Sequence, residues 1–128
     1  MKKQKFYIDL ELDFSLLAIS CHLKDYRFVW GVNNILNANF IKTKIYNNGN
    51  VCPSYEFVMD SSSAQIYVNR TEENIMINNK PEIDFWLKIY DIEGSQIVKF
   101  WCEEIKRIPH VLIVYTEENK KIKEQFLA

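Results

Sequence analysis

Histidine and cysteine are the residues of this chain best suited to chemistry, and they are few. His110 lies in the stretch EEIKRIPHVLIVYTEEN, and His22 directly follows Cys21. A histidine that acts as an acid, a base or a metal ligand needs a partner, and the nearest local candidates for His110 are Glu103 and Glu104 on the preceding predicted helix. We therefore predict a structural or surface role for His110, at a corner between a helix and a strand.

The sequence lacks the common motifs of zinc sites and phosphate-binding loops. The chain has no CxxC, HxxxH, GxGxxG or GxxxxGK[ST] pattern and only three glycines, which disfavours a zinc site or a phosphate-binding loop. Adjacent carboxylates point in different directions on a helix or strand, so they are typical of solvated faces; such pairs stand at Glu72-Glu73, Glu103-Glu104 and Glu117-Glu118. We expect no metal, no cofactor and no catalytic residue.

Composition predicts a single domain over residues 1–128. The chain is 48% hydrophobic, which is enough for one buried core. Its formal net charge of −1 gives no strong attraction to phosphates, so we do not expect nucleic acid as the main partner. No apolar run approaches the roughly 18–20 residues that span a bilayer, and nothing at the start reads as a signal peptide. Three widely spaced cysteines are typical of free thiols in a reducing compartment, so we expect a cytoplasmic protein without membrane association and treat the Asn69 sequon as accidental.

Two kinds of hydrophobic periodicity define the expected elements. Alternation predicts strands over 6–12, 54–60, 65–71, 82–90 and 110–115, with 54–60 and 65–71 forming a hairpin. The stretch 13–20 could extend the first strand or form a separate short one, and 74–81 could add a short edge strand. A three-to-four-residue repeat predicts helices over 23–36 and 96–108, the second capped by Ser95 and ended by Pro109. The span 37–54 is expected to be rich in loops. This order predicts an α+β two-layer sandwich, a mainly antiparallel sheet with two helices on one face, for which a ferredoxin-like arrangement is the nearest named fold.

Three stretches, LKDYRFVWGVN, IDFWLKI and IKRIPHVLIVYTEE, together resemble a small uncharacterised bacterial family called the IPExxxVDY family. The resemblance covers most of the chain apart from the loop-rich middle. This chain has Ile-Asn-Asn at 77–79 where the signature reads Ile-Pro-Glu, and Ile-Asp-Phe at 83–85 where it reads Val-Asp-Tyr. The resemblance supplies no catalytic residue, but it draws attention to Asp84, which we interpret first as an outward-facing strand residue.

Aromatic residues gather on one predicted face of the sheet. Trp86 and Tyr90 leave the same side of their strand, and Tyr67 and Tyr7 could join them on the side away from the helices. The strand 111–114 is apolar on both faces, so something must cover its second face. A second copy is the favoured cover, and the C-terminal segment KKIKEQFLA is the alternative. The expected interaction residues are Trp86, Tyr90, Leu112, Val114 and Asp84.

These features favour a non-enzymatic cytoplasmic domain that acts through protein contacts as a homodimer. The first alternative is a small-molecule-sensing regulatory domain, which a pocket lined by convergent polar groups would favour. A single-stranded RNA-binding module is the next alternative, because sheet aromatics can stack on bases, although the chain lacks a basic balance and the motif that RNA-binding sheets use. A flat aromatic face closed by a symmetry mate would instead favour the interaction domain.

Overall fold

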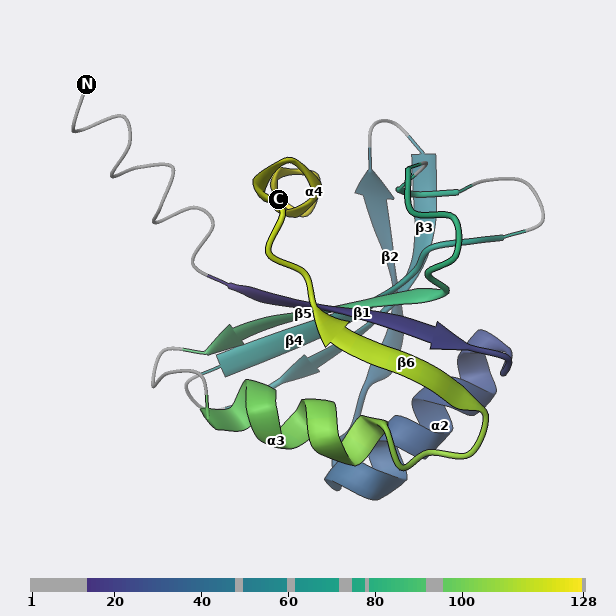
Figure 1. Cartoon of the computed structure of the whole chain (residues 1–128), viewed down its shortest axis with the longest axis vertical. Helices are drawn as coiled ribbons and strands as arrows, with labels where there is room; N and C mark the ends of the chain where they lie inside the picture. The colour runs from purple at the N-terminus through teal and green to yellow at the C-terminus, as the bar shows by residue number, and fades with distance from the viewer. Residues whose placement is uncertain are drawn as a thin grey trace.

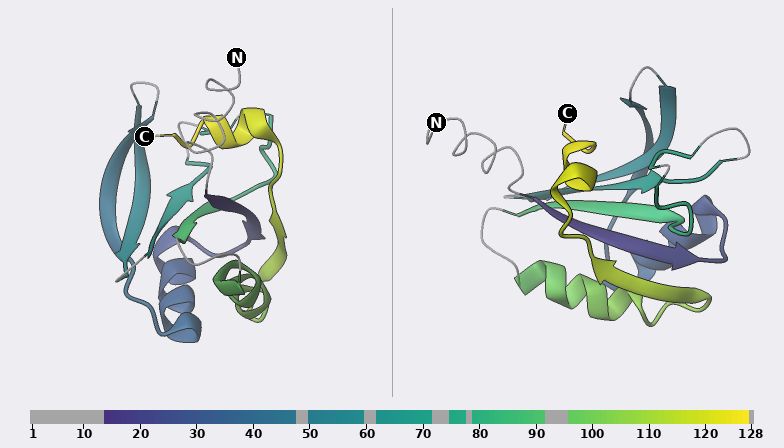
Figure 2. Two further views of the ribbon diagram at one scale, coloured as in Figure 1. Left: turned by 90° about the vertical axis from the view of Figure 1, so that its left-hand side faces the viewer. Right: turned by 45° about the horizontal axis from the view of Figure 1, so that its top comes forward.

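The computed structural model describes residues 14–47, 50–59, 62–71, 75–77, 79–91 and 96–127. Figures 1 and 2 show a twisted sheet with α2 and α3 on one face and the short α4 on the other. The elements are β1 (Ser15–Cys21), α2 (Asp25–Leu36), β2 (Ile41–Asn47), β3 (Asn50–Val58), β4 (Ser62–Val68), β5 (Phe85–Asp91), α3 (Gln96–Ile105), β6 (Val111–Thr116) and α4 (Lys120–Glu124). No helix among these residues is long and apolar enough to cross a membrane.

The sheet has six strands in the order β2-β3-β4-β5-β1-β6, and every neighbouring pair is antiparallel. The expected α+β sandwich with two helices on one face is therefore confirmed. β1 lies between β5 and β6, so the connection through α3 joins two strands that run in the same direction with a third strand between them. A ferredoxin-like fold contains this unit in a four-stranded sheet. Here a four-strand meander, β2 to β5, makes the sheet wider.

The larger part of the core lies between the sheet and the two main helices. Phe28 of α2 stacks on Phe85 of β5 with ring centroids 4.3 Å apart, and Trp101 of α3 meets Phe40 edge-on at 6.2 Å. Val98 and Ile105 extend the buried stripe of α3. Trp101 and Ile105 belong to the repeat that predicted α3, so the predicted and the buried sides of this helix agree. In α2 the agreement is partial, because Val29 and Val32 are buried but Trp30, which the repeat placed on the same side, is 71% exposed.

A second apolar cluster fills the opposite face of the sheet. Its buried members are Phe14, Leu16, Ala18, Tyr67, Ile77, Ile83, Trp86, Ile122 and Phe126. β1 contributes to both clusters, since Leu16 and Ala18 point to this face while Leu17 and Ile19 point to the helices. A central strand that is buried on both faces carries a continuous apolar run, which explains the sequence SLLAISC.

The span 37–54, which we expected to be rich in loops, instead forms most of a hairpin. β2 and β3 pair from Ile41↔Glu56 to Asn47↔Asn50, which leaves a two-residue connection. The expectation was wrong because Asn-Gly between two strands is a strong hairpin signal, and because β3 continues through Pro53 instead of breaking there.

Other expectations have mixed outcomes. The hairpin of β3 and β4 is present, with pairs from Ser54↔Tyr67 to Val58↔Ser63. In the expected edge strand within 74–81, the described residues show only an isolated bridge, Arg70↔Ile75. The predicted strand over 6–12 lies outside the described residues.

The corner between α3 and β6 fits closely against α2. α3 ends before Pro109, and His110 then adopts a left-handed conformation with φ of 73°, which turns the chain into β6. Ile108 of this corner packs on Gly31, where an added Cβ would come within 3.1 Å of the Ile108 Cγ2 atom. Gly31 therefore lowers the intrinsic stability of α2, but it permits this close approach.

Candidate functional site

The structure separates residues that the sequence placed together on one interaction face. Trp86 belongs to the apolar cluster opposite the helices, whereas Val114 is buried in the cluster beneath α2 and α3. Val114 pairs with Ile19, and paired residues in an antiparallel ladder point to the same face. β1 also lies between β5 and β6, so Val114 is not beside Trp86. The expectation that they share a face was wrong, because the alternation within one strand does not specify how that strand is aligned with its neighbours.

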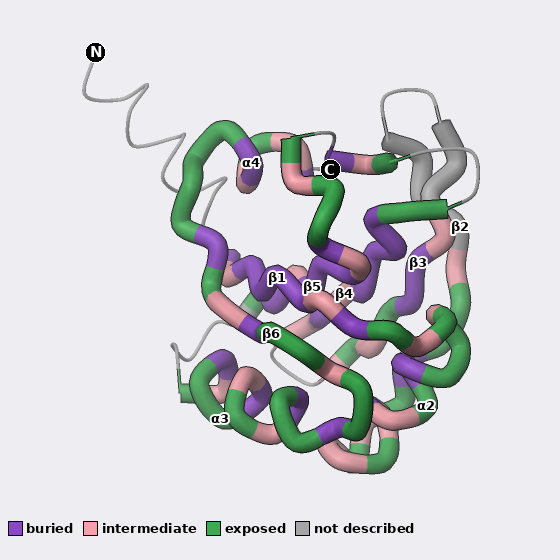
Figure 3. Tube along the Cα trace, turned by 45° about the vertical axis from the view of Figure 1, so that its right-hand side comes forward, coloured by how far each residue is buried: buried purple, intermediate pink, exposed green. Residues whose placement is uncertain are grey.

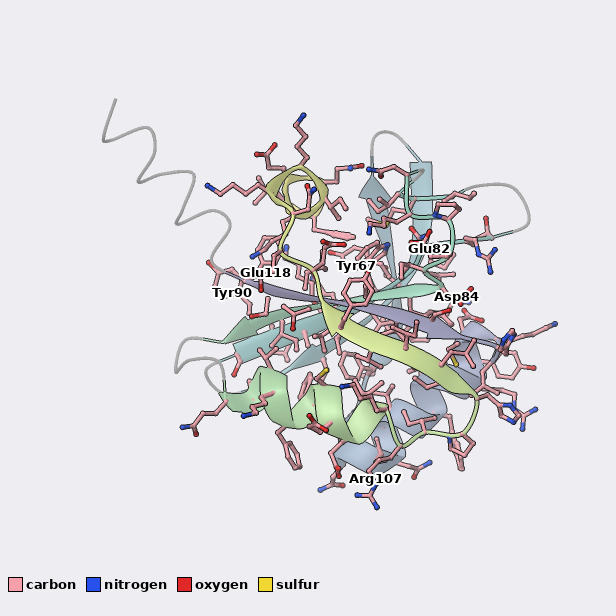
Figure 4. The ribbon with its side chains drawn as sticks, in the orientation of Figure 1. Tyr67, Glu82, Asp84, Tyr90, Arg107 and Glu118 are labelled. Atoms are coloured by element: carbon pink, nitrogen blue, oxygen red, sulfur yellow. The ribbon has the colours of Figure 1, made fainter. Side chains whose placement is uncertain are left out.

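The C-terminal segment covers the aromatic face. Phe126 stacks on Tyr67 with ring centroids 5.1 Å apart and meets Trp86 edge-on at 5.5 Å. Lys88 Nζ donates a hydrogen bond of 2.6 Å to the Phe126 carbonyl oxygen, and Ile122 is 2% exposed. In Figure 4 the Tyr67 ring lies in the region between α4 and β6. The alternative cover that the sequence offered is thus present within one chain, and Trp86 is fully buried there.

Two apolar side chains of the expected interaction set remain at the surface. Leu112 is 58% exposed and Tyr90 is 43% exposed, and the two lie on different strands. Next to Leu112, Ile113 is 54% exposed, and Figure 3 shows this exposed stretch of β6 along the edge of the sheet. The paired residues shift register between Ser20 and Cys21, so Leu112 has no direct partner on β1. We call residues 111–116, with their outward-facing backbone, the β6 edge.

Alternate residues of the β6 edge point their backbone groups away from the sheet. Glu117 N donates a hydrogen bond of 2.7 Å to Leu16 O, so these two residues form a hydrogen-bonded pair. Hydrogen-bonded and non-hydrogen-bonded pairs alternate along an antiparallel ladder. Tyr115 and Ile113 therefore direct their backbone groups to β1, and Thr116 and Val114 direct theirs outward. The Cys102 thiol lies 3.9 Å from the Val114 carbonyl oxygen, a long contact from a weak donor.

Asp84 is a structural bridge as well as a polar residue at the start of β5. Its Oδ2 accepts a hydrogen bond of 2.8 Å from Cys21 N and one of 3.3 Å from Ser20 Oγ. Its Oδ1 accepts a 2.7 Å bond from Arg70 Nη2. The carboxylate thus ties the end of β1 to the segment after β4, and the side chain is 19% exposed. A simple outward-facing strand position does not describe it.

A cleft of about 630 Å³ opens beside this bridge, and we call it the Arg70 cleft. It is formed by the start of α2, one position of β3, the end of β4 and the start of β5. Its lining residues are Leu23, Lys24, Asp25, Pro53, Val68, Arg70, Thr71, Ile75, Asp84 and Phe85. At its helix end, Asp25 accepts a 2.9 Å hydrogen bond from the Tyr55 hydroxyl, and burial together with this bond raises the pKa of Tyr55 to about 12.

The histidines and cysteines do not converge on a reactive centre. His22 N donates to His110 O at 3.2 Å, so these residues meet through the backbone while both side chains are exposed. Burial raises the pKa of the Cys21 and Cys102 thiols, which makes them poor nucleophiles at neutral pH. Among the residues that the structure describes, no group of three or more histidine, cysteine, aspartate or glutamate side chains could hold a metal ion.

Asn69 is the polar residue whose importance the sequence did not reveal. It is 1% exposed, and its amide nitrogen donates to the carbonyl oxygens of Lys80 and Ile83 at 3.0 and 2.7 Å. Its Oδ1 accepts bonds of 2.9 Å from Ile77 N and from Trp86 Nε1. The side chain therefore holds the segment between β4 and β5 against the sheet. Its burial leaves no room for a glycan, and its only local signal was the sequon that we set aside.

The chain matches no protein-family model. No curated protein matches it either. The resemblance to the IPExxxVDY family therefore stays a prediction, and the β6 edge and the Arg70 cleft are the features of the molecule that bear on its function.

Proposed function

We propose that this chain is a non-enzymatic cytoplasmic interaction domain that forms a homodimer by pairing its β6 edge with that of a second copy. The proposal rests on a difference between the two outer strands of the sheet. β2, with the sequence IKTKIYN, carries two lysines, which disfavour pairing with another strand. β6, with the sequence VLIVYT, has no charged residue and no proline. Among the described strands, β6 is thus the edge without these protective residues.

A second copy is a suitable occupant because the β6 edge is self-complementary. The outward backbone groups of Val114 and Thr116 include both donors and acceptors, so two antiparallel copies can satisfy each other about a two-fold axis. If that axis passes beside Val114, Ile113 comes opposite the second copy's Tyr115, and no like charges meet within the strand. The exposed surfaces of Leu112 and Ile113 would then be reduced, which favours association.

The aromatic face supports this choice of surface indirectly. Tyr67 and Trp86, which an RNA-binding sheet would need for base stacking, lie under Phe126 within the same chain. Single-stranded RNA binding would require the C-terminal segment to leave, so it ranks below strand pairing. A six-residue strand gives a small interface, and we expect a dissociation constant in the range of about 1–100 μM.

Sedimentation equilibrium over about 1–300 μM protein tests the proposal. The wild-type mass should rise from one chain to two, and Ile113→Lys should keep the protein monomeric by placing a charge on the pairing strand. Thr116→Pro should act in the same way, because it removes an outward N–H while leaving the bonds to β1. Ile41→Lys is the matched control, since Ile41 is 63% exposed on β2, and it should dimerise like the wild type.

Two results would contradict the proposal. If the wild-type protein stays monomeric at the highest concentration, the β6 edge does not pair with a second copy. A dimer that Ile113→Lys leaves intact, and that Ile41→Lys disrupts, pairs through β2 instead.

A further inference from the structure

The Arg70 cleft combines an apolar wall with charged groups of both signs. Half of its lining residues are apolar, namely Leu23, Pro53, Val68, Ile75 and Phe85. The charged ones are two cations, Lys24 and Arg70, and two carboxylates, Asp25 and Asp84. A volume of about 630 Å³ lies within the usual range of small-molecule sites, roughly 300–1,000 Å³. The cleft is therefore large enough for a compact organic molecule.

Both carboxylates of the cleft are already engaged by the protein. Asp84 accepts three hydrogen bonds, from Arg70, Cys21 N and Ser20 Oγ. Asp25 accepts a hydrogen bond of 2.9 Å from the Tyr55 hydroxyl. Asp84 therefore has little capacity left to accept further hydrogen bonds, whereas Asp25 keeps most of its own. A cationic ligand would also be repelled by Lys24 and Arg70.

The cations, in contrast, retain donors. Arg70 is 50% exposed and uses one nitrogen, Nη2, for Asp84, which leaves further N–H groups of its planar guanidinium without a partner among the described residues. Asp84 fixes one end of that guanidinium, so its orientation is set before a ligand arrives. The Lys24 ammonium has no partner within the described part of the chain, and Lys24 also precedes α2 without capping the helix by its side chain.

We propose that the Arg70 cleft binds a small monocarboxylate with an apolar body. Its carboxylate accepts hydrogen bonds from the N–H groups of Arg70 that do not bind Asp84, a geometry that the guanidinium fork suits, and Lys24 adds a second positive charge. Its apolar body lies on Val68, Phe85 and their neighbours. A single negative charge fits best, because a phosphate dianion would face Asp25 and Asp84 with only two cations to offset all the charges.

This site is independent of the β6 edge. Its lining comes from α2, β3, β4, β5 and the segment that follows β4, and it includes no residue of β6. A chain that fails to dimerise can therefore still bind the ligand, and the two proposals can be tested separately. Together they would make the chain an interaction domain that also senses a small organic acid.

Titration of the ¹⁵N-labelled full chain, followed by backbone amide shifts, tests this inference. The probes are 3-methylbutanoate and phenylacetate, with phenylacetamide as the neutral match and phenyl phosphate as the dianionic one. We expect saturable shifts at Leu23, Val68 and Phe85, with half-saturation at or below about 1 mM for a carboxylate. Phenylacetamide and phenyl phosphate should bind at least about tenfold more weakly, since each lacks a monoanionic carboxylate.

Substitutions at Arg70 show whether the guanidinium is responsible. Arg70→Gln should weaken carboxylate binding by about tenfold or more, and Arg70→Lys should retain part of the affinity because it keeps the charge but loses the fork. Arg107→Gln is the control, because Arg107 is an exposed arginine paired with Glu104 near the end of α3, far from Asp84 in Figure 4. Unchanged shift dispersion in each variant shows that it has folded.

Four outcomes would overturn the inference. These are no saturable shift with either carboxylate up to about 10 mM, shifts centred away from the cleft, equal binding of the amide, and tighter binding of the phosphate. Retention of full affinity by folded Arg70→Gln would equally remove Arg70 from the site.

Discussion

Replacing Asn69 with alanine should be among the most destabilising changes in the chain. The substitution leaves two buried donors, Ile77 N–H and Trp86 Nε1–H, without their acceptor and deprives the carbonyls of Lys80 and Ile83 of a donor. Each buried donor left unpaired costs about 1–3 kcal/mol, so we expect the free energy of unfolding to fall by about 4 kcal/mol. Few single substitutions exceed this.

Urea unfolding followed by circular dichroism and tryptophan fluorescence measures the loss. For a slope near 1.5 kcal/mol per molar urea, the midpoint should fall by about 2.7 M. Asn69→Asp should be similarly harmful, because it keeps the acceptor oxygen but sets a second oxygen against the carbonyls of Lys80 and Ile83. Asn34→Ala is the control, since its amide makes one exposed bond to Trp30 O, and it should change stability by less than about 0.5 kcal/mol. A loss below about 1 kcal/mol in Asn69→Ala would refute the reasoning.

Four further predictions concern separate parts of the fold. Phe126→Ala should lower the free energy of unfolding by about 3 kcal/mol and increase binding of a hydrophobic dye, because it removes the ring that covers the aromatic face; unchanged dye binding would contradict this. The pKa of Tyr55 is raised from 10.0 to about 12, so the stability it contributes is complete below pH 10.0 and should fall as the pH rises to about 12; Tyr55→Phe should lack this alkaline decline in urea midpoints. His110→Gly should keep or raise the melting temperature, because φ at this position is 73°, and His110→Gln should lower it only slightly. Burial should slow the reaction of Cys21 and Cys102 with a thiol reagent in the folded chain. After denaturation without a reductant, titration should find three free thiols per chain. A count of one would indicate a disulfide.

The sequence alone determined the elements whose pattern is local. The alternation in EIDFWLKIY predicted β5, and the three-to-four-residue repeats predicted α2 and α3, since the side-chain period follows from backbone geometry. Pro109 predicted that the helix stops before it, because proline cannot continue the hydrogen-bond ladder of a helix, and α3 ends at Ile105, three residues before the predicted end at Ile108. The order of these elements was enough to predict an α+β sandwich, which the sheet topology confirms.

Tertiary structure decided which residues meet. Val114 and Trp86 carry similar apolar patterns, but the register of β6 on β1 turns Val114 toward the helices, and no pattern within one strand specifies its partner's register. Asn69 looks like an ordinary loop residue in the sequence, and its four side-chain partners lie 8 to 17 residues away along the chain. Arg70 and Asp84 are brought together in the same way, across 14 residues. The Arg70 cleft exists only because long-range strand pairing places these groups beside the start of α2.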